Sequence, residues 1–169
     1  MVYNYTVKKE FAEITVDATN LGHVRDAVVV LFERVRKETE SSRLGYVAGI
    51  IGSEGEDKVA VNRQILQEHT DRIRAANGFP VFSATDIFEN PELWERLEEI
   101  RLSTPERRKA FIAFWREVLE LGKVTDIFMT PRWEQSEGAT DEYNTAQRLG
   151  IQIHIVDHQV LVESIEKGK

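Results

Sequence analysis

The stretch LGYVAGIIG, residues 44–52, is a short continuous apolar run that is closed by glycines. Such a run between turn residues is typical of a strand buried in a parallel sheet. Further along the chain, three more segments predict strands: 79–84, 124–129 and 151–156. We therefore expect a sheet that is built mainly of parallel strands.

Helix signals separate these strands. Ser53 and Glu56 have the spacing of a capping box, and an apolar face then runs toward Asn77-Gly78. The other expected helix boundaries are Asn90-Pro91, Ser103-Thr104-Pro105, Gly122 and Gly150. This alternation predicts an α/β fold with a three-layer, doubly wound (Rossmann/flavodoxin-like), mainly parallel sheet. Ligands of such folds bind beyond the carboxyl ends of the strands.

The first 40 residues predict an extra N-terminal βα unit. Residues 10–17 alternate like a strand, and an apolar stripe at helical spacing follows Asn20. A strand at 27–32 is the alternative for part of that stripe. We expect one domain over residues 1–169, with 1–40 as a βα extension and 41–169 as the core.

Composition limits the classes of function. The 169 residues carry 22 Lys and Arg against 29 Asp and Glu, a net charge of -7, which disfavours binding to polymeric nucleic acid. The absence of cysteine excludes disulfides and thiolate chemistry. Residues 1–10 lack the apolar run of a signal peptide, and no segment has the length of a membrane helix, so we expect a cytoplasmic protein without membrane contact.

The segment PRWEQSEGATDEYNTAQRLG, residues 131–150, holds the strongest candidate for chemistry. Glu142 shares a helical stripe with Ala139 and Ala146 that is expected to face the sheet. A carboxylate there needs a partner or a cavity, and such groups are functional candidates. The alternative is a rotated helix in which Tyr143 points inward and Glu142 is solvated.

Small residues surround two strand-to-helix junctions. Ser136 and Gly138 precede the last helix, whose free N–H groups favour an anion or sugar hydroxyls. Gly49 and Gly52 lie at the first junction and offer a similar site. The alternative is that Ser136 only caps the helix and that the glycines only serve turns.

The remaining polar groups predict no metal centre and no redox cofactor. The histidines, His23, His69, His154 and His158, fall on different elements without a zinc pattern. The basic run Arg107-Arg108-Lys109 is expected to be a solvated helix face, with contact to a phosphate as the alternative.

The segments GYVAGIIG (45–52) and WEQSEGATDEYNTAQRLGIQI (133–153) together resemble the nucleoside 2-deoxyribosyltransferase-like superfamily. The later segment is especially similar to its small DUF4406 branch. The resemblance covers residues 45–157 and implies a small-molecule nucleoside or nucleotide as the substrate. By this resemblance Tyr46 and Gly49 line the sugar pocket, Ser136 and Gly138 precede the key helix, and Glu142 attacks C1′ of the sugar.

The resemblance also implies catalytic roles for Tyr46 and for the acidic residue Asp126, and it leaves two features open. Nucleotide hydrolases of the superfamily tend to carry a basic or hydroxyl residue just after the first glycine, where this chain has residues 50–52, IIG. The second acid, which handles the leaving base, has no clear counterpart. Glu117 and Asp86 are the two candidates for it.

Two functions follow as hypotheses. One is an N-glycosidic bond hydrolase or 2-deoxyribosyltransferase with a glutamate nucleophile, and the other is a nucleotide sensor without turnover. We also expect a homodimer or higher homo-oligomer. The resembled superfamily commonly associates, and apolar residues are in excess at 28–32 and 111–115. Phe32 would be an outer residue of that contact.

Overall fold

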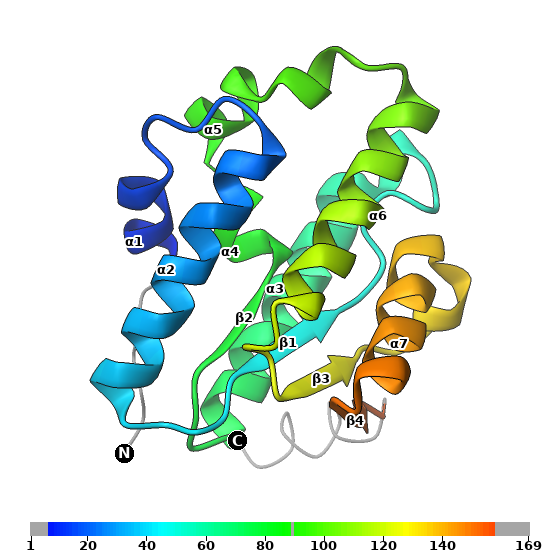
Figure 1. Cartoon of the computed structure of the whole chain (residues 1–169). Helices are drawn as coiled ribbons and strands as arrows, with labels where there is room; N and C mark the ends of the chain where they lie inside the picture. Colours follow the sequence, from blue (N-terminus) through cyan, green and yellow to red (C-terminus); the bar gives the residue numbers. More distant parts are fainter. Residues whose placement is uncertain (1–6, 89, 158–169) are drawn as a thin grey trace, which may run out of the picture.

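A four-stranded parallel sheet lies at the centre of a three-layer α/β structure (Figure 1). The structure is a computed structural model that describes residues 7–88 and 90–157. The strand order is β2-β1-β3-β4. The strands are β1 (Gly45–Ala48), β2 (Val81–Ser83), β3 (Asp126–Met129) and β4 (Gln152–Ile155). The doubly wound α/β fold of Rossmann/flavodoxin-like type is therefore confirmed.

The helices occupy both faces of this sheet. They are α1 (Val7–Ile14), α2 (Leu21–Thr39), α3 (Val59–Ala76), α4 (Ala84–Phe88), α5 (Pro91–Arg96), α6 (Thr104–Glu120) and α7 (Glu137–Leu149). Single 3-10 turns are η1 (Glu56–Lys58), η2 (Glu98–Arg101) and η3 (Trp133–Gln135). In Figure 1, α2, α6 and α7 lie in front of the sheet and α3 lies behind it.

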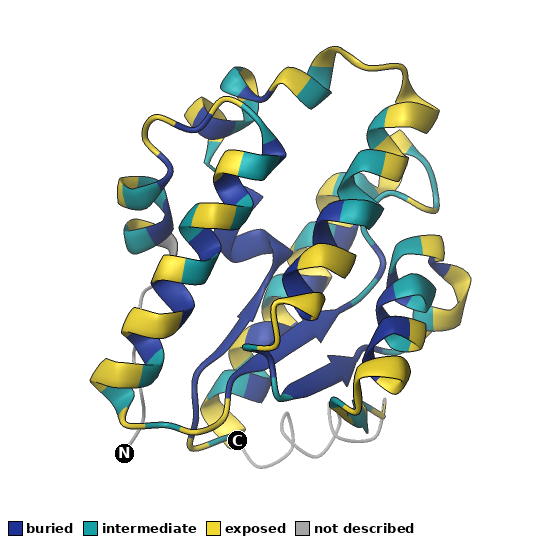
Figure 2. Cartoon of the chain, viewed as in Figure 1, coloured by how far each residue is buried: buried dark blue, intermediate teal, exposed yellow. Residues whose placement is uncertain are grey.

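Two apolar clusters correspond to the two faces of the sheet. Leu66 and Ile73 of α3 pack with Val47 and Phe128 of the central strands. On the other face, α2, α6 and α7 share a larger cluster with Tyr46. Every residue of β1, β2 and β3 is buried, as Figure 2 shows in dark blue. Burial on both faces explains why these strands are continuous apolar runs rather than alternating ones.

The N-terminal segment differs from the predicted βα unit. Residues 10–17 form no strand, because helix α1 runs from Val7 to Ile14 and turns follow it. Phe11, Thr15 and Ala18 are buried at spacings of four and three, which is the period of a helix. Over so few residues this pattern is easily mistaken for the alternation of a strand. The helix after Asn20 is confirmed as α2, whose first turn Asn20 caps, and the alternative strand at 27–32 is wrong.

Two local expectations on the way to the site are also wrong. Ser53 and Glu56 form no capping box, since α3 begins at Val59 after the turn η1. The segment between the expected strand at 79–84 and Asn90, for which no helix was expected, contains the buried helix α4. The Asn90 cap is confirmed, because its side chain accepts a hydrogen bond from the Glu92 N–H.

Most of the apolar excess at 28–32 is buried within the chain, although Val30 is 53% exposed. Val28, Leu31 and Phe32 are buried, and the Phe32 ring lies 4.4 Å from that of Phe82. The interpretation of Phe32 as an outer residue is therefore wrong, and a charge at this position would disrupt the core. A homo-oligomer stays a prediction without support from this stripe.

No described helix combines the length and the apolar content that crossing a bilayer requires.

Candidate functional site

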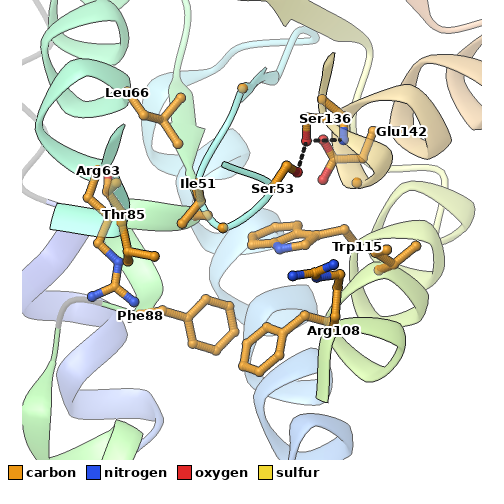
Figure 3. A pocket seen from close by; sticks show the side chains of 18 of the residues that line it. Ile51, Ser53, Arg63, Leu66, Thr85, Phe88, Arg108, Trp115, Ser136 and Glu142 are labelled. Atoms are coloured by element: carbon orange, nitrogen blue, oxygen red, sulfur yellow. Dashed lines mark hydrogen bonds between the residues drawn. The ribbon is translucent and has the colours of Figure 1, made fainter. Parts of the chain in front are cut away.

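A cavity of about 260 Å³ opens where the winding of the sheet changes direction. The chain passes from β1 to β2 on one side and then to β3 on the other, so the carboxyl ends of β1 and β3 border a crevice. The cavity wall is drawn from the loop after β1, from α3 and α4, from the first half of α6 and from the start of α7. Figure 3 shows these side chains converging from different elements.

Glu142 and Tyr46 form a buried hydrogen-bonded pair in the cavity wall. The Tyr46 hydroxyl donates to Glu142 Oε1 at 2.8 Å, and the two residues are 2% and 6% exposed. Burial raises the pKa of Glu142 to about 8, although the hydrogen bond from Tyr46 opposes this shift. Burial also raises the pKa of Tyr46 well above its usual value. A pKa of about 8 means that the Glu142 carboxyl is largely protonated at pH 7.

The orientation of α7 decides between the two interpretations of Glu142. Ala139, Glu142 and Ala146 are buried on one face of the helix. Tyr143 stays partly exposed and stacks on Trp133, with ring centroids 4.4 Å apart. The inward interpretation of Glu142 is thus confirmed, and the rotated helix is wrong.

Ser136 begins α7 and lies beside the loop after β1. Its Oγ accepts hydrogen bonds from the Ala139 N–H and from the Ser53 hydroxyl, both at 3.2 Å. Neither bond uses the hydroxyl proton of Ser136. Since Ser136 also lines the cavity, it can donate that proton to a ligand. Its role as a helix cap is confirmed at the same time.

Three glycines of the sequence prediction line the cavity: Gly49, Gly52 and Gly138. A Cβ at Gly49 would collide with the Thr130 hydroxyl, so the close approach of these two loops requires glycine there. A Cβ at Gly52 meets nothing within 4 Å, and one at Gly138 makes only ordinary contacts, the nearest at 3.8 Å. No close contact requires glycine at those two positions. The missing side chains there leave space in the cavity.

Glu54 joins the two loops that border the crevice. One carboxylate oxygen pairs with Arg132 of the loop after β3 at 3.1 Å. The other accepts a hydrogen bond from Asn62 of α3, whose amide also donates to the Ile51 carbonyl. These bonds, together with the contact between the two serines, hold the Gly49–Gly52 backbone against the start of α7.

Asp126 does not belong to this site. It is the first residue of β3 and lies at the amino end of the sheet, outside the cavity wall. Its carboxylate accepts hydrogen bonds from Arg43, Thr125 and His154. Burial alone would raise the pKa of Asp126, but these bonds outweigh burial and lower it to about 2. The arrangement stabilises the fold, which corrects the catalytic expectation for this residue.

Replacing Asp126 tests this structural role. We expect Asp126→Asn to lower the free energy of unfolding by about 1–3 kcal/mol at pH 7, because a charge-assisted network loses its acceptor. The difference shrinks as the pH falls from about 4 to 2, where Asp126 of the wild type is protonated in the unfolded and then in the folded state. Urea unfolding at pH 7 and at pH 3 measures both effects. Equal stability of the two proteins at pH 7 would contradict the assignment.

The two candidates for a second acid lie elsewhere. Glu117 is an exposed partner of Arg25, and buried Asp86 pairs with Arg74 and accepts from the Ser83 N–H. Neither lines the cavity. The carboxyl side chains that line it in the described part of the chain are Glu142 and Glu56 of η1. Sequence analysis missed Glu56 because it was assigned to a helix cap.

Arginines from two helices also line the cavity: Arg63 of α3 with Arg107 and Arg108 of α6. The interpretation of Arg107 and Arg108 as part of a solvated face is therefore incomplete. Arg63 gave no local signal, since only the packing of α3 brings it to the cavity. The described residues contain no group of three or more His, Asp or Glu arranged to hold a metal ion, and His158 lies outside them.

Comparison with known proteins gives one match. No curated protein and no solved structure matches the chain. Residues 45–155 match a family described as a domain of unknown function (DUF4406). The matched segment is about two thirds of the chain and contains β1 through β4 with the cavity residues between them. The chain therefore belongs to the DUF4406 family.

Proposed function

We propose that this protein cleaves the N-glycosidic bond of a nucleoside or nucleotide, with Glu142 as the nucleophile. The observation that carries the proposal is a buried carboxyl group, held by Tyr46, that faces a cavity at the switch point of an α/β sheet. A buried carboxyl with a shifted pKa in a cavity is typical of a catalytic acid, base or nucleophile. The likeness of the 133–153 segment to nucleoside 2-deoxyribosyltransferases supports the same reaction class.

The proposed reaction has two displacement steps, as in retaining glycosidases. Ionised Glu142 forms a bond from a carboxylate oxygen to C1′ of the sugar, and the C1′–N bond breaks with its electron pair leaving on the base. The departing base takes up a proton. Water or a second base then attacks C1′ and gives its proton to the group that protonated the first base, and the ester bond breaks to restore the carboxylate. Tyr46 keeps the carboxyl group in place throughout.

The apolar part of the cavity suits a nucleobase. Phe88, Phe111 and Trp115 line it, and Phe88 meets both other rings edge-on, with centroids 5.2 Å and 6.0 Å away. Trp115 also stacks on Tyr46 at 4.9 Å. Aromatic faces bind the flat face of any base, and such stacking tolerates different bases. Ser136 and the backbone near Gly138 provide polar groups for sugar hydroxyls.

Attack requires the ionised form of Glu142, which predominates above about pH 8 in the free protein. We therefore expect kcat/KM for base release to rise with pH up to about 8, because this parameter reports on groups of the free enzyme. Initial rates from pH 5.5 to 9 measure the profile. A profile that is flat, or one that falls over this range, would contradict a carboxylate nucleophile with this pKa.

We assign Glu56 the role of the general acid that gives its proton to the departing base. We expect Glu56→Gln to lower kcat by about a hundredfold, the lower end of the usual contribution of a general acid. Asp57→Asn is the matched control, since Asp57 is the exposed neighbour in η1 and lies outside the cavity wall. Steady-state rates of base release decide the matter. Equal rates for the two variants would remove Glu56 from the reaction.

A nucleotide-binding sensor without turnover is the second candidate function. The observation that favours it is the protonated state of Glu142 at pH 7, which weakens the group as a nucleophile. Such a module would use the same aromatic and polar lining to bind its ligand.

One assay separates the two functions. Purified protein is incubated with the common ribo- and deoxyribonucleosides and their 5′-monophosphates, with and without an acceptor base, and release of base is followed by chromatography. Release that depends on Glu142 supports the enzyme. Thermal stabilisation by a ligand without release supports the sensor, and the absence of both effects rejects the two functions together.

A further inference from the structure

The cavity carries a positive rim that the proposed cleavage reaction does not use. Arg63 comes from α3, and Arg107 and Arg108 come from the first two turns of α6. Figure 3 shows Arg63 across the cavity from Glu142, and Arg108 in front of Trp115. All three arginines line the same cavity, which two separate helices border. The chain has a net charge of -7, so a group of positive side chains around one cavity needs an explanation.

The arginines of this rim lack carboxylate partners within residues 7–88 and 90–157. Arg63 lies over the Trp94 ring at 5.6 Å, and Arg107 donates only weak hydrogen bonds of 3.4–3.5 Å to the Ile100 carbonyl and the Thr104 hydroxyl. Six of the other eleven arginines form ion pairs: Arg25, Arg43, Arg74, Arg116, Arg132 and Arg148. The donors of the rim are thus available to a ligand.

The start of α6 adds to the positive potential at the same place. Thr104 opens the helix and lines the cavity. Ser103 makes no side-chain cap there, so free N–H groups remain in a first turn that has the positive end of the helix dipole. Glu56 and Glu142 are the carboxyl side chains of the cavity wall in the described part of the chain, so three arginines face two carboxyl groups.

We propose that the substrate carries a phosphate group, which Arg63, Arg107 and Arg108 bind at the mouth of the cavity while its sugar lies at Glu142. This inference rests on the proposed function and narrows its substrate class to nucleotides. Guanidinium groups match phosphate oxygens with paired hydrogen bonds, and three of them suit the charge of a phosphate monoester. They also offset the repulsion between that group and the ionised nucleophile. The site lies on α3 and α6, and Ile51 and Gly52 line the same cavity.

Calorimetry on the full chain tests the proposal, with Glu142→Gln as the background so that ligand is not consumed. The first probe is a nucleoside from which the wild type releases the base or, if none is found, each common nucleoside in turn. The other two probes are the 5′-monophosphate of that nucleoside and inorganic phosphate. We expect the monophosphate to bind at least about tenfold tighter than the nucleoside and than inorganic phosphate. Equal binding of nucleoside and monophosphate would overturn the proposal, as would inorganic phosphate binding as tightly as the monophosphate.

Substitutions on the rim assign the effect to these residues. Arg107→Gln with Arg108→Gln should weaken binding of the monophosphate about tenfold and change nucleoside binding less than twofold; Arg63→Gln should act in the same direction. Lys109→Gln is the matched control, because it removes one positive charge from the adjacent, exposed position outside this cavity. Unaltered nucleoside binding also shows that the variants fold. An equal loss for both ligands, or an equal effect of Lys109→Gln, rejects the assignment.

The test of phosphate binding and the test of base release can succeed or fail independently. Base release that requires Glu142 without any preference for phosphate rejects this inference and keeps the proposed function. A preference for phosphate that depends on the arginines, without base release from any ligand, supports the anion site and rejects the proposed cleavage. Absence of binding by every probe rejects both.

Discussion

Glu142→Gln is expected to lower kcat for base release at least about a thousandfold, equivalent to about 4 kcal/mol of transition-state stabilisation. The amide cannot form the ester with C1′, so the first displacement is lost. Its oxygen still accepts the hydrogen bond that Tyr46 donates, and its volume matches that of the carboxyl group. Ligand affinity should therefore stay within about threefold of the wild-type value, which makes the loss one of kcat rather than KM.

The control for this substitution is Glu137→Gln. Glu137 is an exposed residue of the same helix, and it lies outside the cavity wall. Stopped chromatographic assays at saturating ligand give kcat, and calorimetry gives affinity. Comparable turnover by wild type, Glu137→Gln and Glu142→Gln would contradict the nucleophilic role of Glu142.

The same substitution should remove the pH dependence that Glu142 gives to the free energy of unfolding. The pKa of Glu142 is about 8 in the folded chain against 4.5 as the ordinary value, so between these pH values the folded state binds one more proton than the unfolded state. Its contribution is complete below pH 4.5 and is lost as the pH rises toward 8. The wild type therefore loses about 1.4 kcal/mol of unfolding free energy per pH unit relative to Glu142→Gln, or about 4 kcal/mol from pH 5 to 8.

Urea unfolding at pH 5, 6.5 and 8 measures this difference. Groups other than Glu142 titrate alike in the two proteins and cancel when the curves are subtracted. Glu137→Gln should follow the wild type at every pH, because it removes an exposed carboxylate from the same helix. A constant difference between wild type and Glu142→Gln across the range would show that the buried carboxyl is ionised in the folded protein.

The fold could be predicted because β1, β2 and β3 are buried on both faces and form apolar runs between turn residues. β4 is partly exposed, and it was located by the segment that follows Gly150. Asn20, Asn90 and Gly150 marked helix ends by their local chemistry. The failure at residues 10–17 has the opposite cause. Over eight residues, periods of 2 and 3.6 both place Phe11 inside, and only the packing of α1 on the rest of the core separates them.

The site was predictable where a single element carries the signal. The stripe of α7 placed Glu142 among buried alanines, and the turn after the first strand placed Gly49 at the cavity. Tyr46 was assigned only through the resemblance to the superfamily. The hydrogen bond between Glu142 and Tyr46 joins residues 96 positions apart, so spacing alone could not reveal it. Glu56 and Arg63 reach the cavity through the docking of η1 and α3, which is a tertiary property. Asp126 was assigned through the resemblance, whereas in the structure it is the first residue of β3 and lies at the amino end of the sheet.

The most direct test of the central claim is a search for the covalent sugar ester on Glu142. A nucleoside or nucleotide that the protein turns over is mixed with it, the reaction is quenched in acid within the first turnover, and intact mass and peptide mapping follow. The account predicts added mass equal to the sugar, or sugar phosphate, on the peptide that contains Glu142, and no addition in Glu142→Gln. Turnover without an adduct, or an adduct on another residue, would contradict it.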